Sequence, residues 1–289
     1  MRTVLATVLF VNLAGSVVGA GEPLLMCGST EVFLVDSEAA EGGTIEKLWH
    51  WTAAESDGIP ASLVPTFVHM DECKPVDGGR RILACSSSGG CVLIERSTGR
   101  ALWHAVATNA HSAELLPAGR VVVASSLSGD HLILFDLKSP NTPLWKTPLH
   151  SAHGVVWDAK RERLWALGFD ELRCYRLQDW NGNAPRLELE STATLPDESG
   201  HDLVAIDDRE LLVTTHHHVY RFDRESREFR KHERLGDVAD VKSISVHPTT
   251  GRTAHSIWKS RVELTNPEGE IVLKKARPYK VRWLATKDP

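Results

Sequence analysis

The chain has little of what marks several protein classes. Among its 289 residues, 33 basic residues are outnumbered by 38 acidic ones, which gives a net charge of −5. Nucleic-acid binding depends on a surface rich in basic residues, which this charge balance argues against. No nucleic acid is therefore expected as a partner. After residue 20 there is no apolar run long enough to cross a bilayer, so no membrane span is expected in the mature chain.

Motifs of common enzyme classes are also missing. The sequence contains no Gly-x-Ser-x-Gly elbow, no glycine-rich phosphate loop and no dinucleotide fingerprint. It also lacks a set of His, Cys, Asp or Glu residues with the fixed spacing of a metal motif. No cofactor is therefore expected, and no linker rich in Gly, Ser or Pro divides the chain.

Cysteine is scarce and odd in number, with Cys27, Cys73, Cys85, Cys91 and Cys174. An odd count leaves at least one thiol unpaired. A bridge between Cys85 and Cys91, across a short hairpin, and a bridge between Cys27 and Cys85 in adjacent repeats are both compatible with the sequence. A catalytic thiol is not expected, because most of these residues lie within apolar strands where Cys packs as a small hydrophobe.

Residues 1–20 have the pattern of a secretory signal. Arg2 supplies the positive start, Val4 to Val18 is largely apolar, and Val18-Gly19-Ala20 offers the small residues that signal peptidase accepts. A retained anchor is the alternative. The pattern predicts a secreted or periplasmic protein in which residues 21–289 form a single domain.

The most informative feature is one short strand that occurs six times. Its copies are Val32–Asp36, Cys91–Glu95, Leu132–Asp136, Leu172–Arg176, Val219–Asp223 and Arg261–Thr265. The last residues of successive copies are 59, 41, 40, 47 and 42 positions apart. A period near forty, built from short strands and turns, predicts an all-β propeller with one four-stranded sheet per blade.

The two ends of the chain predict how the ring closes. The first repeat starts directly at its second strand, Leu24 to Cys27, and the missing first strand is found at Lys280 to Leu284. Pairing the last strand with the first blade gives six blades and removes the exposed sheet edges. Five or seven blades are the alternatives, because the 59-residue interval contains an insertion between Trp51 and Pro65.

The second repeat suggests a family resemblance. Its stretch from Val92 to Trp103 resembles the PQQ-like (quinoprotein-like, WD40-like) repeat, whose hallmark is an Asp-x-x-Thr-Gly-x-x-x-Trp run. The match is partial in repeats one and three and faint beyond them. The resemblance implies a propeller in which Trp49, Trp103 and Trp145 dock one blade on the next. It does not extend to a quinone cofactor, since the chain is shorter than the eight-bladed quinoprotein enzymes.

Polar residues open the first strand of each blade, which in a propeller lines the central channel. These residues are Asp71 and Glu72, His111, His153, His201, Lys242, and Tyr279 and Lys280. Three consecutive blades thus offer a histidine at equivalent positions. Either these side chains simply meet water, or they form a functional ring at one mouth of the channel; we favour the ring.

Hairpins between the second and third strands open at the same mouth. They add His216 and His217 in blade five and Trp258 and Lys259 in blade six. Side chains alternate along a strand, so at most two residues of the triplet at 216–218 reach the mouth. The candidates for a divalent metal are His201, His216 and His217, since imidazole suits such ions.

Two functions suit this ring. The first is binding of an acidic oligosaccharide or polysaccharide, with cleavage by β-elimination: His153 or His201 acts as base, and Lys242 and Lys280 hold the anion. Trp258 or Tyr279 would stack on a sugar. Polysaccharide lyases resemble this chain in architecture alone. Lactone hydrolysis is a weaker variant, since the carboxylates of the ring are limited to Asp71 and Glu72.

The second function is a non-catalytic exported scaffold that binds a protein partner on the same rim. Propeller repeats occur in enzymes and in binding proteins alike, so the fold does not decide between the two.

Overall fold

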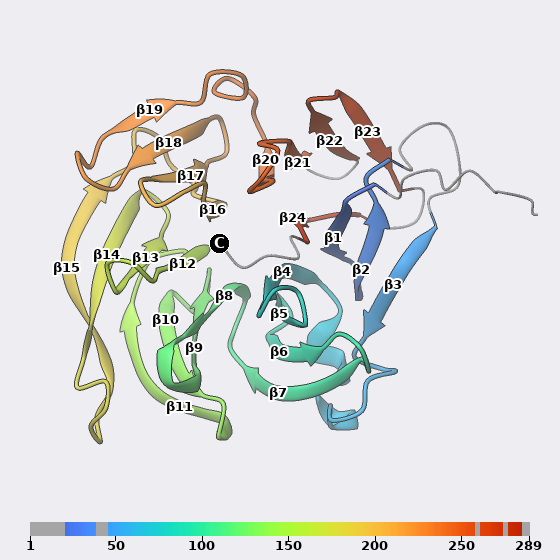
Figure 1. The fold of residues 1–289 in the computed structure, drawn as a ribbon. Helices are drawn as coiled ribbons and strands as arrows, with labels where there is room; N and C mark the ends of the chain where they lie inside the picture. Colours follow the sequence, from blue (N-terminus) through green and yellow to red (C-terminus); the bar gives the residue numbers. More distant parts are fainter. Residues whose placement is uncertain (1–20, 39–45, 258–260, 274–276, 285–289) are drawn as a thin grey trace, which may run out of the picture.

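The computed structural model describes residues 21–38, 46–257, 261–273 and 277–284. These residues form six four-stranded antiparallel sheets arranged as blades around a central axis (Figure 1). The predicted all-β, six-bladed propeller is therefore confirmed. The predicted signal at residues 1–20 lies outside the described residues, as do Trp258 and Lys259.

The strands follow the chain around the ring, from the inner strand of each blade to its outer strand. Blade 1 contains β24 (Lys280–Trp283), β1 (Pro23–Gly28), β2 (Glu31–Asp36) and β3 (Lys47–Thr52). Blade 2 contains β4 (Met70–Val76), β5 (Arg81–Ser86), β6 (Gly90–Glu95) and β7 (Arg100–Val106). Blade 3 contains β8 (Ala110–Leu116), β9 (Arg120–Ser125), β10 (His131–Asp136) and β11 (Ser139–Pro148).

The other three blades repeat the pattern. Blade 4 contains β12 (Gly154–Asp158), β13 (Arg163–Leu167), β14 (Glu171–Gln178) and β15 (Arg186–Thr194). Blade 5 contains β16 (Asp202–Ala205), β17 (Glu210–Thr214), β18 (Val219–Asp223) and β19 (Phe229–Lys231). Blade 6 contains β20 (Val241–Val246), β21 (Thr253–Ile257), β22 (Arg261–Thr265) and β23 (Gly269–Val272). The strand that recurs in the sequence is the third strand of every blade.

Strand β24 closes the ring as predicted. It pairs antiparallel with β1, with Leu25 opposite Arg282 and Cys27 opposite Lys280. In Figure 1 the red β24 lies beside the blue β1 near the axis. Blade 1 thus contains strands from both ends of the chain, and this shared sheet closes the ring.

The insertion that lengthens the first interval to 59 residues does not form a further blade. It carries the 3₁₀ helix η1 (Ala61–Phe67) between β3 and β4; a second one, η2 (Pro117–Gly119), forms a turn in blade 3. The Phe67 ring is buried and meets Trp51 edge to face at 5.8 Å. A side chain at Gly90 would collide with that ring, since a Cβ there would lie 2.6 Å from it.

The core consists of six apolar clusters, one in each gap between neighbouring blades. The cluster between blades 2 and 3, for example, joins Leu93 and Trp103 to Val121 and Phe135. The cluster between blades 6 and 1 joins Ala254 and Val262 to strands β1, β2 and β24. Because the sheets pack face to face in this way, each blade depends on both of its neighbours.

The tryptophans of the outer strands occupy the positions that the repeat implies. Trp49, Trp103 and Trp145 lie opposite Leu34, Leu93 and Leu134 in their respective sheets. Each packs against the cluster that joins its blade to the next. Trp103 is fully buried and meets Phe135 of blade 3 edge to face at 5.8 Å.

All five cysteines are thiols in the structure, and all are buried. Neither of the bridges compatible with the sequence is present. Cys85 and Cys91 are direct cross-strand partners of β5 and β6, whereas Cys27 contacts Cys73 rather than Cys85. Burial raises the pKa of the Cys27 and Cys85 thiols, which suits a packing role.

Replacing the blade-docking tryptophan tests this packing. Trp103→Ala should lower the free energy of unfolding by roughly 3–5 kcal/mol, because it leaves a cavity between blades 2 and 3. Trp145→Ala, at the same register but only partly buried, should cost less. Urea denaturation of both variants measures the difference, and equal losses would contradict a docking role specific to Trp103.

Candidate functional site

The inner strands have one edge that pairs with no other strand. Side chains from the neighbouring blade satisfy part of it: the amides of Val281 and Trp283 in β24 donate to the hydroxyls of Ser243 and Ser245, at 2.9 and 3.0 Å. Likewise the amide of Ile244 donates to Asp202 Oδ2 at 3.0 Å. Polar channel side chains are thus required by the backbone itself.

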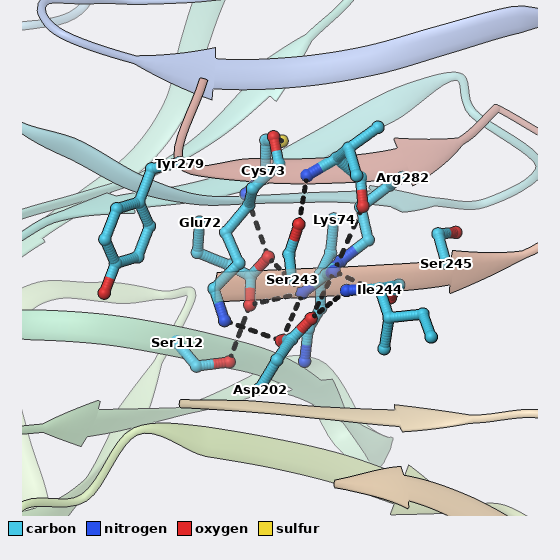
Figure 2. Close-up of polar contacts among 12 residues, drawn as sticks. Glu72, Cys73, Lys74, Ser112, Asp202, Ser243, Ile244, Ser245, Tyr279 and Arg282 are labelled. Atoms are coloured by element: carbon cyan, nitrogen blue, oxygen red, sulfur yellow. Dashed lines mark hydrogen bonds and ion pairs between the residues drawn. The ribbon is translucent and has the colours of Figure 1, made fainter. Parts of the chain in front are cut away.

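Charged side chains of three inner strands contact one another, and Figure 2 shows Glu72, Asp202 and Arg282 among them. Arg282 of β24 donates to both carboxylate oxygens of Asp202 at 2.8 Å, and to those of Glu72 at 3.0 and 3.2 Å. Lys280 donates to Asp202 Oδ1 at 2.6 Å. We call Glu72, Asp202, Lys280 and Arg282 the channel network. It joins blade 1 to blades 2 and 5.

The network is buried, yet Asp202 and Arg282 remain charged. Burial alone would raise the pKa of Asp202, but Arg282 and Lys280 hold it below its usual range. Burial alone would lower the pKa of Arg282, but Asp202 and Glu72 raise it. Two cations facing two carboxylates therefore offset one another at neutral pH.

The channel network lies between two hollows, one at each end of the inner strands. The first residues of these strands line one hollow of ≈ 590 Å³, which we call the histidine mouth; its lining includes Asp71, His111, Lys242, Arg277 and Tyr279. Later residues, including Lys74, Glu114, Ser245 and Arg282, line a hollow of ≈ 450 Å³ at the other end.

Six of the predicted ring residues therefore separate into two groups. Asp71, His111, Lys242 and Tyr279 line the histidine mouth. Glu72 and Lys280 have no exposed surface and belong to the channel network instead. Glu72 also accepts a hydrogen bond from Ser112 Oγ at 2.8 Å. Both side chains are enclosed within the network, and their contact with a ligand stays a prediction.

The three predicted histidines form an arc across blades 3, 4 and 5. The ring centroids of His111 and His153 are 4.3 Å apart, and those of His153 and His201 are 5.4 Å apart. Tyr279 completes the arc on the other side of His111, at 6.1 Å. Burial lowers the pKa of all three imidazoles, with His201 at about 2, so they are neutral at pH 7.

Two backbone carbonyls fix the tautomers in this arc. His111 Nδ1 lies 3.1 Å from the carbonyl oxygen of Asn109, and His153 Nδ1 lies 2.9 Å from that of Ser151. A carbonyl oxygen only accepts, so each Nδ1 carries the proton and each Nε2 has its lone pair. Neutral imidazoles in this state are bases.

His201 and Lys242 form a close pair. Lys242 Nζ lies 2.5 Å from His201 Nε2, and Lys280 donates to the backbone carbonyl of His201 at 2.9 Å. Burial lowers the pKa of Lys242 to about 8, with Lys280 acting in the same direction and Asp240 opposing it.

The histidine triplet lies in the turn between β17 and β18 rather than in a strand, so its side chains do not follow the alternation expected from the sequence. His216 approaches His201, with 6.3 Å between ring centroids, and its Nδ1 lies 3.2 Å from Asp240. His217 and His218 instead contact Asp197 at 3.3 and 3.1 Å. The structure thus brings His201 near His216, whereas His217 faces Asp197 in the segment before β16. Among the described residues, no set of three His, Cys, Asp or Glu side chains is placed to hold a metal.

Several residues of the site escaped the sequence analysis. Asp202 and Arg282 follow the ring positions by one or two residues, and Lys74 binds Glu114 at 2.8 Å on the side of the second hollow. Arg277 adds an exposed cation to the histidine mouth. The alternation of Lys280, Val281 and Arg282 was the available signal, because it aims both cations at one side of β24.

Removing Arg282 tests the channel network. Arg282→Met leaves two buried carboxylates with too little positive charge, and should lower the free energy of unfolding by roughly 3–5 kcal/mol. Arg176→Met, which removes a half-exposed partner of Glu188, should change it little. Guanidinium denaturation compares the two; equal stability of both variants would show that the network contributes nothing.

The lowered pKa of Lys242 predicts a pH dependence of stability. Below pH 8 the folded and unfolded chains both hold the proton, and the cost of burying the charge is present. Between pH 8 and the ordinary value of 10.5, the folded chain has lost a proton that the unfolded chain keeps, so stability gains with rising pH. Lys242→Met should lack this gain. Denaturation at several pH values measures it, with the exposed Lys160→Met as control; identical curves for Lys242→Met and wild type would contradict it.

Of the described residues, none forms a helix with the length and apolar character that crossing a membrane demands. A six-bladed propeller of this kind is a scaffold that supports binding at its loops and channel mouths. No curated protein matches the chain. The model of one family, described as "Family of unknown function (DUF6528)", matches residues 30–288. That match does not test the PQQ-like resemblance, which stays a prediction. It covers nearly the whole propeller, so the chain belongs to the DUF6528 family.

Proposed function

We propose that the protein is an exported propeller that binds an acidic carbohydrate at the histidine mouth and cleaves it by β-elimination. The observation that carries the proposal is the state of His111, a neutral imidazole whose Nε2 lone pair is set by the carbonyl of Asn109. Cations suited to a carboxylate, Lys242 and Arg277, line the same hollow. Tyr279 offers a ring face for a sugar.

His111 is a better candidate base than the two histidines favoured by the sequence. His111 lines the hollow, whereas His153 is 7 % exposed and packs behind the His111 ring. The Nε2 atom of His201 already contacts the amine of Lys242. We therefore assign proton removal to His111, positioning of its ring to His153, and positioning of the Lys242 amine to His201.

The chemistry follows from these groups. Lys242 and Arg277 hold the uronate carboxylate and favour the negative charge that develops beside it. His111 Nε2 takes the proton from the carbon α to the carboxylate. The electron pair of that C–H bond forms a carbon–carbon double bond, the glycosidic C–O bond breaks, and the departing oxygen takes a proton from water. These steps require no cofactor, so a metal held by His201 with His216 or His217 has no part in the proposal.

The experiment combines a panel of uronides with one matched pair of variants. Formation of the unsaturated product raises ultraviolet absorbance. His111→Gln should lower the rate by about 10²–10⁴-fold, the usual contribution of a general base. His50→Gln replaces an exposed histidine on the outer strand β3 and should keep full activity. Thermal melting of both variants should stay near that of wild type.

The same panel distinguishes the alternative function. If no uronide reacts and none binds in calorimetry, the acidic-carbohydrate proposal is wrong, and a scaffold for a protein partner on this rim becomes the better account. If uronides react equally fast in His111→Gln, the base is another residue and the assignment of His111 fails.

A further inference from the structure

Lys242 differs from the other lysines that enter the channel. Lys74 lines the hollow at the other end of the channel, and Lys280 belongs to the channel network. Both lie away from the lining of the histidine mouth, whereas Lys242 forms part of it. The side chain is nevertheless almost completely enclosed, since Lys242 is only 3 % exposed. A lysine held in this way meets a molecule that enters the hollow but little bulk water.

Burial lowers the pKa of the Lys242 amine; Asp240 opposes this effect, and Lys280 acts with it. Its Nζ lies 2.5 Å from Nε2 of His201, an uncharged imidazole that accepts a hydrogen bond from the amine. Lys280 Nζ donates a hydrogen bond to the backbone carbonyl of the same residue, His201. Asp240, the carboxylate on the same segment, contacts His216 at 3.2 Å. The lowered pKa of Lys242 agrees with this setting.

We propose that Lys242 is a nucleophile that forms an imine with a small carbonyl acid, such as an aldehyde or ketone that bears a carboxylate. The Nζ lone pair attacks the carbonyl carbon, and the new C–N bond gives a carbinolamine. The carbonyl oxygen leaves as water after it has taken up two protons, which are the two that nitrogen loses. Water carries the protons between nitrogen and oxygen, and His201 Nε2 positions the amine by accepting its hydrogen bond.

The remaining lining of the hollow selects the ligand class. Arg277 supplies a guanidinium at the rim, which matches a carboxylate. The volume of ≈ 590 Å³ admits a small acid beside the arc of imidazoles. Imine formation at Lys242 does not need His111 to act as a base, so it goes beyond the proposed elimination and is tested separately from it.

Glyoxylate, a small aldehyde acid, serves as the probe. The full chain is incubated at neutral pH with glyoxylate and cyanoborohydride, which reduces the imine to a stable secondary amine, and peptide mass spectrometry then locates the modified lysines. Lys242 should be modified at least about tenfold faster than the exposed Lys160, because more of its amine is neutral at that pH. His201→Gln should slow the modification of Lys242 and leave Lys160 unchanged.

Each outcome decides the proposal. Preferential modification of Lys242 in the wild-type chain supports it, and slower modification in His201→Gln supports the role of His201. Modification of Lys160 and other surface lysines, with Lys242 spared, overturns the proposal. Because the readout is a site of modification in the wild-type protein, it is independent of variant folding and of any activity toward uronides.

Discussion

The interaction on which the structure depends is the buried contact of Arg282 with Asp202 and Glu72. Arg282 belongs to the last strand of the chain, Asp202 to blade 5 and Glu72 to blade 2, so one guanidinium links three parts of the ring across the axis. A buried ion pair is not by itself a gain in stability, because desolvation offsets much of the attraction. We infer that its value here is specificity, because both carboxylates and the hydroxyls of Ser243 and Ser245 receive β24 at one place in the ring.

The channel network also decides where chemistry is available. It fills the middle of the channel with paired charges and separates the histidine mouth from the hollow at the other end. On the mouth side, burial beside Lys242 and Lys280 keeps the imidazoles neutral. The same burial lowers the pKa of Lys242 to about 8. In our proposals, His111 and Lys242 therefore act as a base and a nucleophile, rather than as a simple patch of positive charge.

Much of this architecture was predictable, since the six copies of one strand and the split first blade determine the ring and its closure. The positions of His111, His153 and His201 followed too, because equivalent residues of a repeat occupy equivalent places. What the sequence could not supply was the pairing of groups far apart in the chain. Arg282 lies 210 residues from Glu72 and 80 from Asp202, and no local pattern relates them. For the same reason Lys280 seemed a ligand for anions, although Asp202 already neutralises it.

Hydrogen exchange of β24 tests the central claim most directly. If the channel network locks the last strand into the ring, the amides of Val281 and Trp283 exchange only when the whole propeller unfolds, and their opening free energy equals the global free energy of unfolding. Rapid exchange of these two amides, through local release of β24 while the strands of blade 2 stay protected, would contradict the account.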